Sequence, residues 1–181
     1  MNYCSACGGS ITHQIPQGDN RLRHICNECG VIHYQNPRII AGTLPIYDNK
    51  VLLCRRAIEP RAGFWTLPAG FMENGETSTE AAIRETKEEA DADIDIHGLY
   101  ALFNLPHISQ IYLFFKGDLV DGQFGIGDET LESKLFAEED IPWDFLAFPT
   151  ITRTLKRYFD DRKAGEFPIL MEDIKGLKPL T

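Results

Sequence analysis

Residues 70–92 constrain this chain more than any other segment, because they join a glycine-rich turn to a helix that carries a row of carboxylates. Thr77 and Glu80 stand three positions apart in the pattern of a capping box, which predicts that the helix begins after Thr77. Three glutamates follow at positions i, i+3 and i+4 of this helix and therefore share one face. They are Glu85, Glu88 and Glu89.

Like charges at this spacing repel one another in an isolated helix by roughly 0.2–0.5 kcal/mol per pair. Such a stripe is compatible with two environments, a solvated acidic face or a bound cation. Oxygen ligands on one face, with room left for water and for substrate phosphates, are what Mg²⁺ prefers. The charge pattern by itself therefore leaves both interpretations open.

The order of residues in this segment is more specific than its charge. It follows Gly-x5-Glu-x7-Arg-Glu-x2-Glu-Glu, which resembles the Nudix box, the signature of the Nudix hydrolases. The six positions are Gly70, Glu76, Arg84, Glu85, Glu88 and Glu89. The segment departs from the family pattern at Thr86, where the family has an aliphatic residue, and at Asp91, where it has glycine. A hydroxyl at position 86 can bond back to the preceding turn, and aspartate tolerates a left-handed helix exit.

The resemblance implies a hydrolase of phosphoanhydride bonds that depends on Mg²⁺ or Mn²⁺. It implies that the metal is held by the three box glutamates and by the carbonyl of Gly70. Arg84 is then expected to orient a box carboxylate, Glu76, through a bidentate contact. The proton of the attacking water is expected to pass to a carboxylate of the box or of a later loop, with Glu129 and Glu132 as candidates by position.

Near the beginning of the chain, two Cys-x2-Cys pairs stand 18 residues apart: Cys4, Cys7, Cys26 and Cys29. A glycine follows each pair, and the spacing fits a tetrahedral zinc site. Two disulfides are the alternative, but no apolar secretion signal is recognised, so we expect reduced thiols and structural zinc. With a turn at 18–20, residues 1–36 are predicted to form a zinc ribbon. Its two arginines are offset by Asp19 and Glu28, which favours a structural or dimer-forming role over nucleic-acid binding.

The charge and hydropathy of the whole chain exclude some partners. A formal net charge of −9 over 181 residues opposes nonspecific nucleic-acid binding, which needs a positive field. No apolar run reaches the roughly 20 residues of a membrane span. We therefore expect a cytoplasmic protein with a small-molecule nucleotide substrate and no membrane partner. Cys54, the fifth cysteine, lies in an apolar run and is predicted to be a core residue.

The order of the expected elements predicts a mixed sheet between helices. Strands are expected at 38–47, 51–55, 64–68, 95–102, 110–119 and 129–136, with a loop at 103–109 and an amphipathic helix at 150–162. The Nudix resemblance implies the same α/β/α sandwich, in a domain covering residues 37–165. Residues 166–181 show no strong pattern and are expected to be a C-terminal tail or a dimer contact, and the resemblance suggests a homodimer.

The substrate is the least determined property. A zinc ribbon before a Nudix domain is similar to the NADH pyrophosphatases, although their Ser-Gln-Pro-Trp-Pro-Phe-Pro run is missing here. The chain also resembles FAD and ADP-ribose pyrophosphatases around residues 65–71 and 141–143. We expect cleavage of a nucleoside diphosphate linked to a second moiety, of the FAD, ADP-ribose or NADH type, into two monophosphates. The alternative is a regulator that binds a nucleotide without cleaving it. The candidate substrate contacts are Arg55, Arg61 and Phe71.

Overall fold

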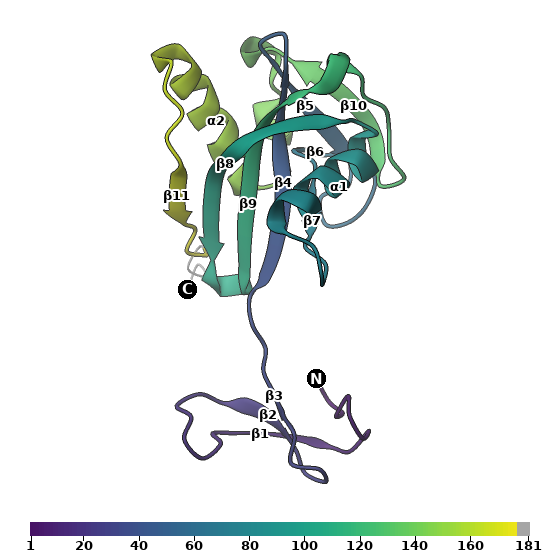
Figure 1. Ribbon diagram of the computed structural model, residues 1–181, viewed down its shortest axis with the longest axis vertical. Coiled ribbons are helices and arrows are strands. Elements are labelled where there is room, and N and C mark those ends of the chain that lie inside the picture. Colours follow the sequence, from purple (N-terminus) through teal and green to yellow (C-terminus); the bar gives the residue numbers. More distant parts are fainter. Residues whose placement is uncertain (177–181) are drawn as a thin grey trace. The chain divides into compact units, whose positions relative to one another are not determined.

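A computed structural model describes residues 1–176 and divides the chain into two compact units, Met1–Pro37 and Arg38–Thr181. The first unit is a three-stranded antiparallel sheet of β1 (Ile11–Gln14), β2 (Arg23–Cys26) and β3 (Ile32–His33), in that order (Figure 1). Gly8 and Gly30 adopt φ values of 77° and 71°, a left-handed conformation that only glycine enters without strain. They close the two tight turns that follow the cysteine pairs.

The second unit is built on an eight-stranded mixed sheet. Six strands follow the order β10-β5-β4-β9-β8-β11, while β6 pairs with β5 and β7 pairs with β4. The contacts β4–β9 and β8–β11 are parallel and the others are antiparallel. The strands are β4 (Arg38–Tyr47), β5 (Lys50–Arg56), β6 (Trp65–Thr66), β7 (Ala69–Phe71), β8 (Ile94–Leu105), β9 (Gln110–Leu119), β10 (Thr130–Phe136) and β11 (Leu170–Asp173).

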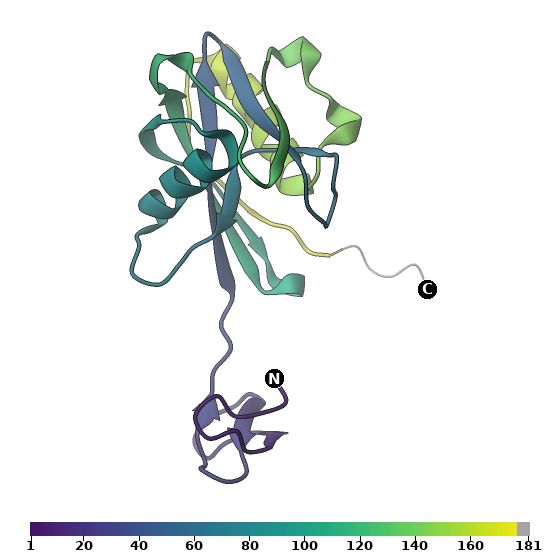
Figure 2. The same ribbon diagram turned by 90° about the vertical axis from the view of Figure 1, so that its right-hand side faces the viewer.

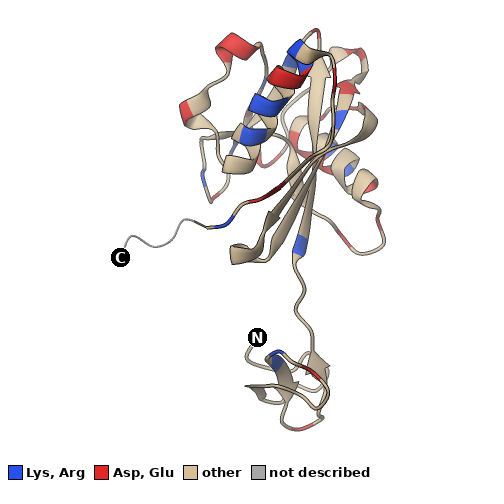
Figure 3. Cartoon of the chain, turned by 90° about the vertical axis from the view of Figure 1, so that its left-hand side faces the viewer, with Lys and Arg blue, Asp and Glu red and all other residues tan. Residues whose placement is uncertain are grey.

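Two helices, α1 (Ser78–Ala90) and α2 (Pro149–Ala164), cover opposite faces of this sheet (Figures 1 and 2). The alternation of β9 shows why, since Phe114 packs with Ile151 of α2 while Phe115 packs with Ala81 and Ala82 of α1. Lysine and arginine residues recur along α2 (Figure 3), and those of its last turn complement the helix dipole. The expected α/β/α sandwich is confirmed.

Four short 3₁₀ turns complete the connections: η1 (Pro106–Ile108), η2 (Val120–Gly122), η3 (Glu138–Asp140) and η4 (Trp143–Phe145). The β4–β5 hairpin turns at Asp48 and Asn49, both with positive φ, as expected for a tight hairpin. Cys54 is 1% exposed, which confirms it as a core residue. In the part of the chain that the structure describes, no helix is long and apolar enough to cross a membrane.

Two expectations about strands were wrong. The predicted loop at 103–109 is shorter, because Phe103 and Leu105 continue the inward alternation of β8 and pair with β9 as far as Leu105–Gln110. The expected C-terminal tail is wrong for Leu170–Asp173, which form β11 in parallel pairing with β8. The local sequence of residues 170–173 gives little indication of a strand. The position of this edge strand depends on its pairing with β8 and on the ion pair between Arg153 and Glu172.

Thr86, which departs from the Nudix pattern, contacts a second threonine in the sheet. The Thr86 hydroxyl donates to the carbonyl of Ala82 at 2.8 Å and lies 2.6 Å from the hydroxyl of Thr43 on β4. Both threonines are 0% exposed, so neither hydroxyl can turn to water instead. The pair therefore replaces an aliphatic contact between α1 and the sheet with a buried hydrogen bond.

This pairing predicts non-additive stability. Thr86→Val should lower the free energy of unfolding by about 1–2 kcal/mol, because it leaves the Thr43 hydroxyl buried without a partner. The Thr43→Val/Thr86→Val double variant should recover most of that loss, since both polar groups are replaced by apolar ones of the same shape. Urea unfolding of the four proteins of the cycle measures this coupling. Additive losses in the double variant would contradict it.

Candidate active site

The box helix α1 begins and ends as its sequence predicts. Thr77 is the N-cap and its side chain accepts from the Glu80 amide at 3.2 Å, while the Glu80 carboxylate accepts from the Thr77 amide at 2.7 Å. Asp91 ends the helix in the left-handed conformation, at φ 42° and ψ 42°. These caps set which residues of α1 face the sheet and which face solvent.

Arg84 is the centre of the box contacts. Its guanidinium donates to both oxygens of Glu76, at 3.1 and 2.8 Å, which is the bidentate contact expected for this pair. Its Nη1 atom also lies 2.7 Å from Glu85 and 3.1 Å from Glu88, and Nη2 donates to the carbonyl of Phe71. The hydrogen bonds from Arg84 hold the pKa of Glu76 at about 2. Two further box carboxylates therefore converge on one cationic atom.

The three predicted metal-ligand glutamates occupy different environments. Burial raises the pKa of Glu85, and burial raises that of Glu89 to about 8, although the Ala69 amide donates to Glu89 at 3.2 Å. The Glu88 side chain is 58% exposed. A Cβ at Gly70 would stand 2.3 Å from the Glu85 carboxylate, so only glycine allows the box turn to approach this closely.

These residues line a cleft of about 1120 Å³ within the second unit. Its acidic end is formed by α1, by the β7 turn and by the loop before β10. The carboxylate-bearing residues there are Glu73, Glu85, Glu88, Glu89, Asp91, Asp128 and Glu129. Glu85 and Glu88 contact Arg84, whereas Glu89 accepts from the Ala69 amide. Hard oxygen donors on one face of α1, two of them with pKa values raised by burial, have the chemistry that a divalent cation such as Mg²⁺ prefers.

The loop between η2 and β10 is hydrogen-bonded to the C-terminal end of α1. The Gly125 amide donates to the Ala90 carbonyl at 2.6 Å, and the Gly127 amide donates to the Glu89 carbonyl at 3.1 Å. A Cβ at Gly127 would overlap the Glu88 carbonyl oxygen at 1.7 Å, so this approach requires glycine. These two hydrogen bonds bring Glu129 into the cleft lining, as expected for a loop near a site.

Of the three candidate substrate residues, only Phe71 lines the cleft. Phe71 lines the cleft with Arg38 stacked on its ring, at 4.5 Å from the ring centroid. Arg55 instead points to the other side of β5, toward Glu132, 3.8 Å away, and Arg61 stacks on Phe64. Neither residue is part of the cleft lining. Glu132, the ion-pair partner of Arg55, is not part of it either.

Arg56 is the strand residue that reaches the cleft. It lies next to Arg55, and strand alternation directs it to the opposite face, where its guanidinium lies 5.3 Å from the ring of Phe148. The charge of Arg56 lowers the pKa of Glu89, and the charge of Glu129 raises it. All three groups therefore interact at the acidic end. Arg56 is not among the substrate contacts expected from the sequence; the two-residue period of β5 is the signal that separates it from Arg55.

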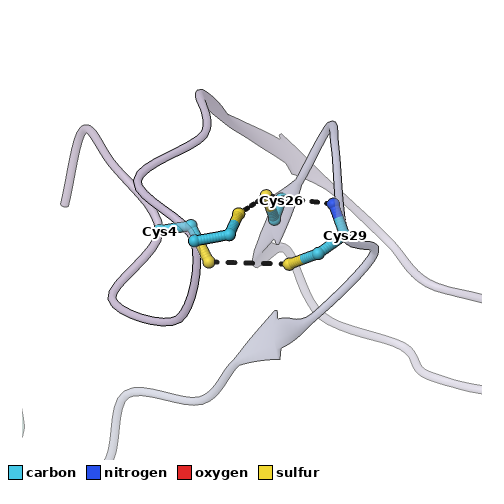
Figure 4. Close-up of side chains that lie close together, drawn as sticks. Cys4, Cys26 and Cys29 are labelled. Carbon is cyan, nitrogen blue, oxygen red and sulfur yellow. Dashed lines mark hydrogen bonds between the residues drawn. The ribbon is translucent and has the colours of Figure 1, made fainter.

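The four cysteines of the first unit form the second candidate site. Their sulfurs lie within 4.8 Å of one another, and those of the labelled residues turn toward each other in Figure 4. The separations of Cys4–Cys29 and Cys7–Cys26 are 3.7 and 3.5 Å. Four sulfurs placed tetrahedrally 2.3 Å from one ion stand about 3.8 Å apart, so the cluster has the size of a zinc site.

Backbone amides support the thiolate form of this cluster. The amides of Ala6, Gly9 and Cys29 donate to sulfurs of the cluster. The hydrogen bond from the Cys29 amide lowers the pKa of Cys26 to about 6, while contacts with the neighbouring sulfurs raise the pKa of Cys7 and of Cys29 despite their own backbone hydrogen bonds. His33 lies with Nε2 3.2 Å from the Cys4 sulfur, where a protonated Nε2 donates to a thiolate. The donor set fits zinc, and no disulfide joins these cysteines.

The raised pKa of Glu89 predicts a pH effect in metal-free protein. Between the unfolded pKa of 4.5 and the folded pKa of about 8, the folded state keeps a proton that the unfolded chain releases. The free energy of unfolding should therefore fall as pH rises through this window, with a contribution of at most about 1.4 kcal/mol per pH unit. Glu89→Gln should remove that contribution. Urea unfolding at several pH values, with a chelator present, compares the two proteins; identical slopes would contradict the assignment.

Comparison with known proteins relates both sites to one family. A family model described as Nudix N-terminal matches residues 2–35, and a model of the NUDIX domain matches residues 36–158. An ADP-ribose pyrophosphatase of Methanocaldococcus jannaschii is 32% identical over 60% of this chain and 67% of its own length. A NAD-capped RNA hydrolase of Schizosaccharomyces pombe is 29% identical over 93% of this chain. The chain spans 45% of that relative's length.

A solved structure agrees with these matches. The crystal structure of a NUDIX hydrolase from Nitrosomonas europaea superimposes with a TM-score of 0.94 at 50% identity, covering 97% of this chain and all of the other. The domain match includes every residue of the acidic box, and the matched ribbon contains all four clustered cysteines. From its sequence and its fold alike, the chain belongs to the Nudix hydrolase family.

Proposed function

We propose that this protein is a Mg²⁺-dependent pyrophosphohydrolase that cleaves a nucleoside diphosphate linked to a second moiety, of the ADP-ribose, NADH or FAD type, into two monophosphates. The observation that carries the proposal is the cleft of about 1120 Å³. This volume is that of a site for a ligand of dinucleotide size. One end gathers the box carboxylates and the other end is apolar, which suits a molecule with a charged centre and an uncharged ring.

The named relatives support the substrate class. They include an ADP-ribose pyrophosphatase and NAD-capped RNA hydrolases, and ADP-ribose and NAD both contain a diphosphate between a nucleoside and a second group. Because this chain matches only part of the length of the RNA hydrolases, we place ADP-ribose first and the NAD type second. A capped RNA would also have to approach a protein with a net charge of −9.

We assign the metal site to Glu85, Glu88 and Glu89 with the Gly70 carbonyl. A divalent cation bound by these residues would neutralise the charge of the diphosphate and orient it. Arg84 holds the carboxylates in position through its contacts to Glu76, Glu85 and Glu88. Arg56, which lines the cleft near Glu89 and Glu129, binds one phosphate of the substrate.

The chemical step is an in-line displacement by water at one phosphorus. A bond forms between the water oxygen and phosphorus, the bridging oxygen–phosphorus bond breaks, and the bridging oxygen leaves on the second monophosphate. A carboxylate of the cleft accepts the proton of the attacking water. We assign this role to Glu129, because it lines the cleft and Glu132 does not.

The assignment predicts different effects for two neighbouring glutamates. Glu129→Gln should lower kcat by about 100-fold, because an amide cannot accept the proton. Glu132→Gln should leave kcat within about twofold, since this residue faces Arg55 outside the cleft. Steady-state kinetics on the best substrate measure both. Equal losses, or a loss confined to Glu132→Gln, would contradict the assignment.

The substrate is tested by incubating the protein with Mg²⁺ and ADP-ribose, NADH, NAD⁺, FAD, diadenosine polyphosphates or nucleoside triphosphates. Separation of the products should show two monophosphates from one linked dinucleotide, and no products without Mg²⁺. Replacing Mg²⁺ with Mn²⁺ tests the second metal. Saturable binding without turnover of any compound would overturn the proposal of a hydrolase and support that of a regulator. No feature of the site favours a regulator.

We also propose that the protein is a cytoplasmic homodimer whose zinc ribbon is structural. Sedimentation equilibrium measures the mass in solution, and imaging of a tagged protein in cells measures the location. A monomer at micromolar concentration would contradict the dimer.

A further inference from the structure

The end of the cleft away from the carboxylates is largely apolar, although His107 and Gln110 also line it beside Leu105. Its apolar lining residues come from β8, β9, α2 and the segment after β11, and they pack together in one hydrophobic cluster. They are Leu105, Tyr112, Phe114, Phe148, Ile151 and Ile174. Several are only partly covered by protein, so this end offers apolar walls to a ligand.

One polar side chain in this lining is unpaired. Thr150 lies on the cleft and is 1% exposed, and its hydroxyl has no hydrogen-bond partner among residues 1–176. The nearby hydroxyl of Thr154 does not supply one, because it donates to the Thr150 carbonyl. Buried hydroxyls in folded proteins are nearly always hydrogen-bonded, so this exception points to a missing partner.

The backbone adds a second donor at the same place. Helix α2 begins at Pro149, and no side chain caps Phe148 at its start. The amides of Ile151 and Thr152 both donate to the Phe148 carbonyl. The Thr150 amide belongs to the first turn of the helix, where amides have no acceptor within the helix. Thr150 therefore offers a hydroxyl and an amide from one residue, between apolar walls.

We propose that this end of the cleft is a nucleobase subsite and that Thr150 is the residue that recognises the polar edge of the base. A flat heteroaromatic ring matches both features, since its faces are apolar and its edge carries hydrogen-bond donors beside acceptors. A hydroxyl both donates and accepts, so it can satisfy such an edge. The proposal rests on the proposed function for the rest of the substrate, whose phosphates reach the box carboxylates.

A ring is favoured over an anion here. Helix amides alone would also suit a phosphate, but the cations of the cleft lining are engaged by carboxylates. Arg84 and Lys87 form ion pairs, and Arg56 lies near Glu89 and Glu129. An anion among Leu105, Ile151 and Ile174 would lose its hydration without a free positive charge. An uncharged ring loses little hydration and gains the contact area.

Three variants separate recognition from folding. Thr150→Val removes the hydroxyl at nearly constant shape, and Thr150→Ser keeps it. Thr154→Val makes the same isosteric change one turn later, outside the cleft lining. Since the Thr150 hydroxyl makes no hydrogen bond in the protein, Thr150→Val should unfold at the same temperature as the wild type or a higher one. A lower melting temperature would indicate a structural role and would overturn the proposal.

Binding is measured on metal-free protein by calorimetry, with adenosine, uridine, ribose 5-phosphate and inorganic phosphate as probes. We expect at least one nucleoside to bind, and Thr150→Val to weaken it by about 3- to 10-fold while Thr150→Ser and Thr154→Val do not. Ribose 5-phosphate and phosphate should bind equally to all variants. No saturable nucleoside binding at millimolar concentration, or a loss confined to the phosphate probes, would overturn the subsite.

Turnover distinguishes this proposal from the function on which it rests. If both hold, Thr150→Val should raise KM for the best substrate by about 3- to 10-fold and leave kcat within about twofold. Hydrolysis with an unchanged KM would overturn the subsite and keep the hydrolase. Nucleoside binding that depends on the Thr150 hydroxyl, in a protein without hydrolysis, would overturn the hydrolase and keep the subsite.

Discussion

Glu88→Gln is expected to lose about 1,000-fold or more in Mg²⁺-dependent kcat while the protein stays folded. The Glu88 side chain is 58% exposed and lines the cleft, and among residues 1–176 its one ion pair is the 3.1 Å contact with Arg84. Its removal therefore costs the fold little. A carboxylate that helps to hold the metal over the diphosphate supplies several kcal/mol in the transition state, and each 1.36 kcal/mol is tenfold in rate.

The choice of Glu88 separates chemistry from stability. Glu85 and Glu89 are more buried, so replacing either would also change the folded state. Glu139→Gln is the matched control, because it removes the same charge from an exposed position outside the cleft. Steady-state kinetics across Mg²⁺ concentrations and a melting curve compare the three proteins. A Glu88→Gln enzyme with wild-type kcat at saturating Mg²⁺ would remove Glu88 from the metal site.

Withdrawal of zinc is expected to unfold the ribbon and leave the second unit folded. Residues 1–37 contain three short strands, and the hydrophobic clusters of the protein are built from residues of the second unit. So small a unit needs a metal to fold, and a structural Zn²⁺ contributes an apparent 10–16 kcal/mol or so at neutral pH. The second unit has its own core, so its stability should not depend on this site.

Amide spectra recorded during titration with a zinc-selective chelator, in the presence of Mg²⁺, test this expectation. The ribbon resonances should lose their dispersion, and those of the second unit should keep theirs. Elemental analysis should give one zinc per chain, and Cys26→Ser should lose it. Cys54→Ala is the control, because this cysteine is buried in the second unit away from the cluster. Ribbon resonances that survive complete removal of zinc would contradict a metal-dependent fold.

The box shows how much local chemistry can be inferred before the fold is known. The capping box at Thr77, the left-handed exit at Asp91 and the bidentate contact of Arg84 with Glu76 all follow from residues within one helix and the turn before it. Contacts over so short a separation depend on the geometry of the helix and of the turn before it. The cysteine cluster was accessible for a similar reason, because two tight turns and a hairpin bring the pairs together.

The cleft could not be inferred in the same way. Its residues come from strands β4 to β9, from both helices and from the loops between them, and the sequence does not say which strands become neighbours. Arg55 was expected at the substrate, but the register of β5 with β10 places it beside Glu132 and turns Arg56 inward. A shift of one residue along a strand reverses the face of every side chain, so this choice depends on pairing across the sheet.

The sequence by itself determined the family, the two sites and the chemistry that each can support, because those properties depend on residue type and on spacing along a helix or a turn. Only the tertiary structure decided which groups share the cleft. It placed Glu129 beside the box through two glycine contacts, added β11 to the sheet edge, and left the hydroxyl of Thr150 unpaired at the start of α2. These features arise from contacts between segments far apart in the chain, for which no local pattern exists.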